Sequence, residues 1–89
     1  MKNKIKRIHF IGIGGSGMSG IAEVMQTLGF TVSGSDLAIS DTIKSLKKLG
    51  IKVYSEHSKA NIKKVDTIVF SNAISRNNPE LIEAKKNKI

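Results

Sequence analysis

The 89-residue sequence contains no cysteine and only one proline, three Phe and one Tyr. Without cysteine the chain cannot form a disulfide bond, bind a metal ion through thiolates or use a cysteine nucleophile. A single proline and 39% hydrophobic residues are typical of a folded domain and not of a disordered segment. The length allows one small domain with a modest core.

Long apolar runs are also missing. No stretch approaches the roughly 20 apolar residues that a membrane-spanning helix needs. The basic start, residues 1–7, precedes an apolar run that is short, contains His9 and leads into glycines. This pattern predicts a β-strand and not a secretion signal, so we expect a cytoplasmic protein with no membrane partner.

Acidic residues are scarce, with 7 Asp and Glu against 15 Lys and Arg and a net charge of +8. Such an excess raises the possibility of a nucleic-acid-binding module. The basic residues are scattered along the chain, however, and aromatic side chains for base stacking are few. We therefore interpret them as solvated helix faces and expect no nucleic-acid partner; retention on DNA that falls steeply with salt would reverse this view.

Residues 10–20, with the sequence FIGIGGSGMSG, are the most informative stretch. Gly12, Gly14 and Gly17 match the pattern G-x-G-x-x-G between a predicted strand and a predicted helix. We assign these glycines, in order, to a tight turn, to backbone approach toward a phosphate, and to close packing of the helix on the strand. The unpaired amides and positive dipole end of the helix then predict an anion site, best suited to a diphosphate.

Strand and helix patterns alternate through the chain. The expected strands are residues 6–11, 31–35, 51–54 and 66–70. The expected helices run from residue 16 or 17 to 28, from the Ser40-Asp41 cap to Gly50, and onward from the cap, proline and acid of residues 78–80, with one or two turns at 58–62. This alternation predicts a three-layer, Rossmann-like α/β fold, with a parallel sheet of order 3-2-1-4 and helices on both faces.

Apolar spacing predicts which faces are buried. On the first helix the buried face comprises Met18, Ile21, Ala22, Met25 and Leu28. On the second it comprises Ile39, Ile43, Leu46 and Leu49. The continuous apolar run in residues 66–70 predicts a strand that is buried on both faces.

In such a sheet the ligand lies beyond the carboxyl ends of the strands, at the switch point between strands one and four. Asp36 follows strand two, roughly 20 residues after Gly17, where an acid commonly accepts a ribose hydroxyl; a turn cap is the alternative. His57 could contact ligand or simply occupy a turn, whereas His9 is expected to be a packed strand residue. Ser71 and Asn72 follow strand four and could equally bond their own backbone.

Read without reference to any family, these features indicate a dinucleotide-binding domain, such as that of an NAD-dependent dehydrogenase or redox sensor. Residues 9–24, 28–30 and 32–36 closely resemble the N-terminal domain of Mur ligases, in the branch that adds L-alanine to UDP-N-acetylmuramate during peptidoglycan synthesis. Matching residues continue over nearly the whole chain, at Gly50, 56–57, 65–66, Val69, 71–74 and 78–80. The chain departs from the family at Glu56, where glycine often stands.

The resemblance implies the first domain of a three-domain enzyme, spanning residues 1–89, with central ATP- and Mg²⁺-binding and C-terminal domains elsewhere. The full enzyme would phosphorylate the muramate carboxylate and let the amine of L-alanine displace phosphate, forming an amide. These residues contain no G-x-x-x-x-G-K-[ST] loop and no acid cluster for a magnesium-phosphate pair. We therefore expect a truncated domain that binds the UDP-sugar without a cofactor and does not catalyse ligation.

The resemblance also implies which residues bind the substrate. The backbone amides of residues 14–17 would receive the diphosphate, and Asp36 would accept from a ribose hydroxyl or the uracil N–H. His57 would border the uridine or the sugar. The full expected set is Gly14, Gly15, Ser16, Gly17, Met18, Ser35, Asp36, His57, Ser71, Asn72 and Ala73.

Overall fold

The computed structural model describes residues 5–89 and contains every predicted strand and helix, with ends that coincide with the expected ones or differ from them by one or two residues. Residues 1–4, the first part of the basic start, lie outside the described part of the chain. In chain order the elements are β1 (Arg7–Ile11), α1 (Met18–Thr27), β2 (Thr31–Ser35), α2 (Asp41–Lys48), β3 (Lys52–Tyr54), the 3₁₀-helix η1 (Lys59–Ile62), β4 (Thr67–Val69) and α3 (Pro79–Lys86).

The four strands form one parallel sheet in the order β3-β2-β1-β4. The register pairs Ile11 of β1 with Ser35 of β2, and Ser35 in turn with Tyr54 of β3. The carboxyl ends of these three strands therefore lie side by side at one edge. The predicted strand order is confirmed, and with it the switch point between β1 and β4.

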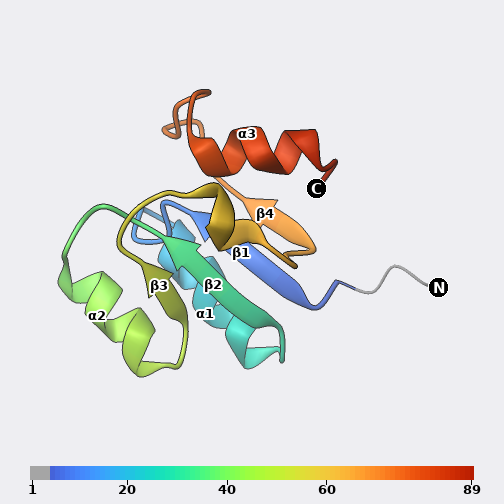
Figure 1. Cartoon of the computed structure of the whole chain (residues 1–89). Helices are drawn as coiled ribbons and strands as arrows, with labels where there is room; N and C mark the ends of the chain where they lie inside the picture. Colours follow the sequence, from blue (N-terminus) through green and yellow to red (C-terminus); the bar gives the residue numbers. More distant parts are fainter. Residues whose placement is uncertain (1–4) are drawn as a thin grey trace.

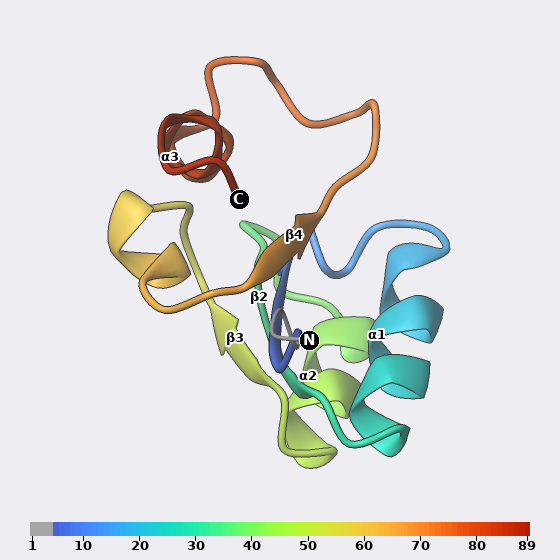
Figure 2. The same cartoon turned by 90° about the vertical axis from the view of Figure 1, so that its right-hand side faces the viewer.

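Helices cover both faces of the sheet. Figure 2, which views the sheet nearly edge-on, shows α1 and α2 on one side and α3 with η1 on the other. Figure 1 shows α3 crossing above the sheet close to β4. The predicted three-layer arrangement is confirmed.

The side chains of β1 alternate between two environments, as the pleat of a strand requires. Ile8 and Phe10 enter the main apolar core beneath α1 and α2. His9, between them, is fully buried and faces the layer formed by α3. The main core comprises Ile8, Phe10, Ile13, Met18, Ala22, Val32, Ile43, Leu46 and Ile51.

Side-chain caps fix the starts of α2 and α3 where the sequence predicts them. The Ser40 hydroxyl accepts a hydrogen bond from the amide of Ile43. The Asn78 side-chain oxygen Oδ1 accepts from the amides of Glu80 and Leu81, and proline occupies the first turn. The second cap places Glu80 at the start of α3, over the sheet.

The predicted buried stripes of the helices are partly wrong. On α1, Met18 and Ala22 are buried and Met25 is partly buried against the core, but Ile21 is 47% exposed because only a narrow face of this helix meets the sheet. Leu28 follows the last residue of α1 and is 66% exposed. On α2 the prediction fails at its two ends. Ile39 precedes the Ser40 cap and Leu49 follows the last helical residue, so both project outside the helix-sheet contact and are largely exposed.

The predicted burial of β4 on both faces is also wrong. All three of its residues are half-buried, and Phe70, which the prediction included, lies beyond the strand and is 44% exposed. Within residues 5–89, β4 pairs with β1 alone and forms an edge of the sheet. The helices therefore cover it less completely than they cover β1.

Among residues 5–89, no helix has the length and apolar character required to cross a lipid bilayer.

Glycine at position 34 is required by the contact between β2 and the loop after β1. A Cβ atom there would lie 2.5 Å from Ile13 Cδ1 and 2.6 Å from Ile13 Cβ. We expect Gly34→Ala to lower the free energy of unfolding by about 1–3 kcal/mol through overpacking. Gly20→Ala is the matched control, since position 20 opens onto free space and alanine favours the helix. Urea denaturation of both variants measures the difference, and equal midpoints would contradict this account of packing.

Candidate functional site

The glycine loop is fastened to the end of β2. The amides of Gly12 and Ile13 both donate to the Ser35 carbonyl oxygen, at 2.8 and 3.1 Å. A turn follows, in which the Gly15 amide donates to the Gly12 carbonyl at 2.9 Å, and α1 then begins. The loop is therefore a fixed connection between strand and helix, as the G-x-G-x-x-G pattern predicts.

Two of the four predicted phosphate-binding amides already have partners within the protein. Gly14 donates to Asp36 Oδ2 at 2.9 Å, and Gly15 donates to Gly12. Within the described residues, the amides of Ser16 and Gly17 donate to no other group, and both residues are exposed. These two amides lie immediately before α1, at the positive end of the helix dipole, which is a position that favours the binding of an anion.

Two of the three glycines are required for reasons that differ from the predicted ones. Close packing was assigned to Gly17, but a Cβ there would meet nothing within 4 Å; glycine is needed because φ is +79°. Close packing occurs instead at Gly14, where a Cβ would lie 2.8 Å from Ile43 Cδ1 and 3.0 Å from Asp36 Oδ2. The prediction for Gly12 is confirmed, since it turns the chain with φ +77°.

Asp36 lies beside the loop, as predicted. Its Oδ1 accepts from the Ala38 amide at 2.9 Å, in addition to the bond from Gly14 to Oδ2. Each carboxylate oxygen accepts up to two hydrogen bonds, so capacity for a ligand donor remains. Asp36 also borders a hollow lined by Ile43, Val53 and Ser55, among others. Both predicted roles, as turn cap and as ligand acceptor, are compatible with this position.

Met18 and Ser35 lie in the interior of the protein. Met18 is 7% exposed and its amide donates to the Gly15 carbonyl, whereas Ser35 is fully buried. Of the predicted site residues, these two support the edge at the carboxyl ends of the strands, and their side chains are not exposed there.

The segment after β4 lies next to the glycine loop. Ile74 Cδ1 approaches Gly12 so closely that a Cβ on Gly12 would stand 3.0 Å from it. Ser71, Asn72 and Ala73 are exposed, and the Ser71 hydroxyl accepts from the Ala73 amide at 3.2 Å. Ser71 therefore bonds its own backbone, one of the two predicted alternatives, while all three residues remain accessible at the switch point.

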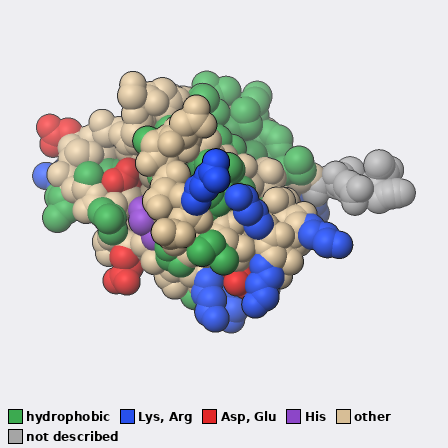
Figure 3. Space-filling view, turned by 90° about the horizontal axis from the view of Figure 1, so that it is seen from above, with side chains coloured by type: hydrophobic (Ala, Val, Ile, Leu, Met, Phe, Trp, Pro, Cys, Tyr) green, Lys and Arg blue, Asp and Glu red, His purple; other side chains and the backbone are tan. Residues whose placement is uncertain are grey.

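His57 joins this edge from the segment after β3. Its Nδ1 lies 2.7 Å from Ser35 Oγ, and its side chain is 17% exposed. Figure 3 shows histidine reaching the surface with acidic groups on either side. The structure thus brings together the glycine loop and the segments that follow β2, β3 and β4, as predicted.

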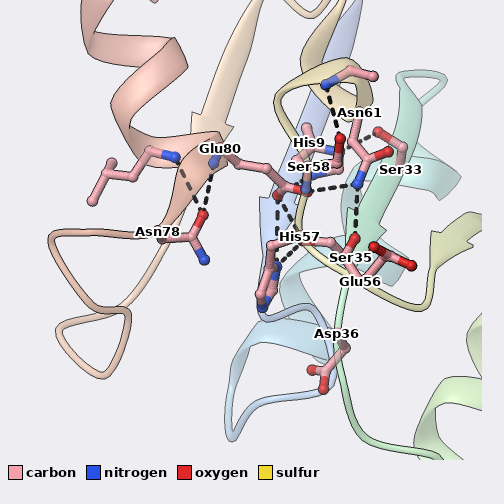
Figure 4. Close-up of polar contacts among 12 residues, drawn as sticks. His9, Ser33, Ser35, Asp36, Glu56, His57, Ser58, Asn61, Asn78 and Glu80 are labelled. Atoms are coloured by element: carbon pink, nitrogen blue, oxygen red, sulfur yellow. Dashed lines mark hydrogen bonds and ion pairs between the residues drawn. The ribbon is translucent and has the colours of Figure 1, made fainter.

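A buried carboxylate lies behind the edge, and the sequence analysis missed it. Glu80 is fully buried, and its Oε1 accepts from His9 Nε2 at 2.8 Å and from the Ser35 hydroxyl at 2.6 Å. Its Oε2 accepts from the Ser58 amide at 3.1 Å and from Asn61 Nδ2 at 2.7 Å. Figure 4 shows these donors converging on the carboxylate from several segments.

His9 is the packed strand residue that the sequence predicts, but its packing is polar. Besides the bond to Glu80, its Nδ1 lies 2.8 Å from Ser33 Oγ. The available signal was a histidine within an apolar strand, because a buried ring nitrogen requires a partner. The sequence does not say which of the distant acids supplies it.

Comparison with known proteins gives the family. Residues 7–89 match the sequence model described as "Mur ligase family, catalytic domain". The chain belongs to the Mur ligase family. The resemblance read from the glycine loop and the later motifs is therefore confirmed.

Relatives in this family are ligases. UDP-N-acetylmuramate-L-alanine ligases from Polaromonas sp. and Janthinobacterium sp. are 53% and 55% identical to it over all 89 residues, which span 19% of each relative. The chain thus covers about a fifth of the length of these Mur ligases. Nothing in these comparisons supports the NAD-binding alternative.

Solved structures of the family share this fold. The UDP-N-acetylmuramate-alanine ligase from Thermotoga maritima superposes with a TM-score of 0.89 at 35% identity, over 97% of this chain and 20% of that one. A UDP-N-acetylmuramate:L-alanyl-gamma-D-glutamyl-meso-diaminopimelate ligase from Neisseria meningitides gives 0.80 at 36% identity, over 96% of this chain and 27% of that one.

The environment of Glu80 controls its ionisation. Burial by itself opposes the charged form, but hydrogen bonds from His9, Ser35 and Asn61 outweigh burial and lower the pKa of Glu80 from 4.5 to about 2. The ionised carboxylate is thus the form that this Mur ligase fold contains at neutral pH. Among residues 5–89, no group of three or more His, Asp or Glu side chains could hold a metal ion in its place.

The lowered pKa predicts how stability depends on pH. Because ionised Glu80 is favoured in the folded state, its contribution is complete above pH 4.5 and disappears as the pH falls toward 2. This difference corresponds to about 3 kcal/mol. We expect Glu80→Gln to remove that part of the pH dependence, so that the two proteins converge in stability at acid pH. Urea titrations between pH 2 and 7 test this, and parallel curves for wild type and variant would contradict it.

Proposed function

We propose that this chain is the N-terminal, substrate-binding domain of an ATP-dependent ligase that joins L-alanine to UDP-N-acetylmuramate. The relatives that carry this activity in their names are more than 50% identical to it. The observation that carries the proposal is the pair of open amides at Ser16 and Gly17, at the amino end of α1 and at the switch point of the sheet. A diphosphate is the anion that suits such a loop.

In this proposal the domain holds the UDP part of the substrate. The diphosphate lies against Ser16 and Gly17, and Asp36, with the hollow beside it, receives the ribose or the uracil. His57 and the segment 71–73 border the remainder of the ligand. Fixing this distant part of the substrate orients the muramate carboxylate for a reaction whose other participants are bound elsewhere.

The remaining parts of the reaction belong to the rest of the proposed enzyme. ATP and Mg²⁺ would bind a central domain, and a C-terminal domain would complete the site for L-alanine. The residues described here would hold and orient the nucleotide sugar and supply no group to phosphoryl transfer. A peptidoglycan precursor of this kind implies a cytoplasmic enzyme.

The sharpest test places a negative charge where the diphosphate is expected. Ser16→Glu should weaken the binding of UDP-N-acetylmuramate at least roughly 10-fold, because the carboxylate repels the ligand's phosphates. Ser45→Glu is the matched control, since Ser45 is exposed on α2 and the change in net charge is the same. Isothermal titration calorimetry on the three proteins measures the difference.

Two results would contradict the proposal. One is equal affinity for the nucleotide sugar in the Ser16 and Ser45 variants. The other is wild-type protein that binds NAD more tightly than UDP-N-acetylmuramate, which would return the chain to the dinucleotide-binding alternative.

A further inference from the structure

The hydrogen bonds around Glu80 have a direction that follows from the chemistry of their donors. The Ser58 amide and the Asn61 side-chain NH₂ are donors, and both bond Oε2. An ionised carboxylate accepts and cannot donate. The Ser35 hydroxyl, 2.6 Å from Oε1, must therefore direct its only proton to Glu80.

The direction of the Ser35 bond determines the protonation of His57. With its own proton given to Glu80, Ser35 Oγ can only accept from His57 Nδ1, which lies 2.7 Å away. Neutral His57 must then carry its proton on Nδ1, which leaves Nε2 as an acceptor. Figure 4 shows the ring with its other nitrogen pointing away from Glu80.

We propose that Glu80 is a positioning residue that acts through Ser35 to make His57 Nε2 a hydrogen-bond acceptor for a donor group of the bound ligand. The ligand part rests on the proposed function, in which the donor is a hydroxyl or imide N–H of a nucleoside diphosphate sugar. Glu80 touches no ligand itself, since its side chain is fully buried between α3 and the sheet.

Glu80→Gln reverses the direction of this hydrogen-bond chain. The Ser58 amide cannot turn, so the glutamine oxygen must take the place of Oε2, and its NH₂ group then faces Ser35 and His9. Ser35 now accepts from glutamine and donates to His57 Nδ1. His9 Nε2, which also faces this NH₂, becomes an acceptor as its proton moves to Nδ1, where the Ser33 hydroxyl accepts it. Every group then remains paired, so the fold is retained while the His57 proton moves to Nε2.

Nitrogen-15 NMR of the histidine rings tests this directly, at a pH where titration shows His57 to be neutral. Wild type should show the proton on Nδ1 of His57, and Glu80→Gln should show it on Nε2. Glu83→Gln, one turn along α3 on a weakly bonded and partly exposed glutamate, should leave the wild-type pattern. A wild-type proton on Nε2 would overturn the proposal without any variant, as would a Glu80→Gln protein that keeps the proton on Nδ1.

Calorimetry separates this proposal from the proposed function. We expect Glu80→Gln to weaken UDP-N-acetylmuramate binding by roughly 10-fold, the effect of one lost hydrogen bond, while Glu83→Gln binds as wild type does. Uridine shows which donor is involved, because it has the imide N–H and the ribose hydroxyls and lacks the amino sugar. Unchanged affinity despite a reversed tautomer would overturn the ligand part. If wild type binds no nucleotide sugar while the tautomers behave as stated, the proposed function fails together with the ligand part, and the control of the His57 tautomer by Glu80 stands.

Discussion

The edge of the sheet where the carboxyl ends of β1, β2 and β3 meet depends on the hydrogen bonds that the buried Glu80 carboxylate accepts. It accepts four hydrogen bonds: one from β1, one from the end of β2, one from Ser58, which caps η1, and one from Asn61 within η1. A buried charge is tolerated only when it is paired in this way. Glu80 thereby fastens α3 to the sheet and fixes the end of β2 from below, which is where the glycine loop is attached.

Ser35 contributes both a backbone group and a side chain to this same edge. The Ser35 carbonyl holds the start of the glycine loop, while the Ser35 hydroxyl connects Glu80 with His57. One residue of β2 thus links the buried network to the exposed edge. This arrangement explains why a fully buried serine falls among the residues that sequence resemblance assigns to the substrate site.

Periodicity and local motifs predict the fold of this chain well. The glycine loop, the Ser40 and Asn78 caps and the alternation of strands and helices each depend on neighbouring residues, so they can be read from the sequence. Burial is predicted less well, because Ile39 and Leu49 match the helical spacing but lie just beyond the ends of α2. The Glu80 network could not be predicted, since His9 and Glu80 are 71 positions apart and meet only when α3 packs across the sheet.

The most direct test of the account is a crystal structure of the chain with UDP-N-acetylmuramate. The account predicts diphosphate oxygens within hydrogen-bond distance of the Ser16 and Gly17 amides, and a ligand donor on Nε2 of His57. Density for the nucleotide sugar in another place, such as the basic hollow that Lys59, Lys63 and Asn87 line between η1 and α3, would contradict it.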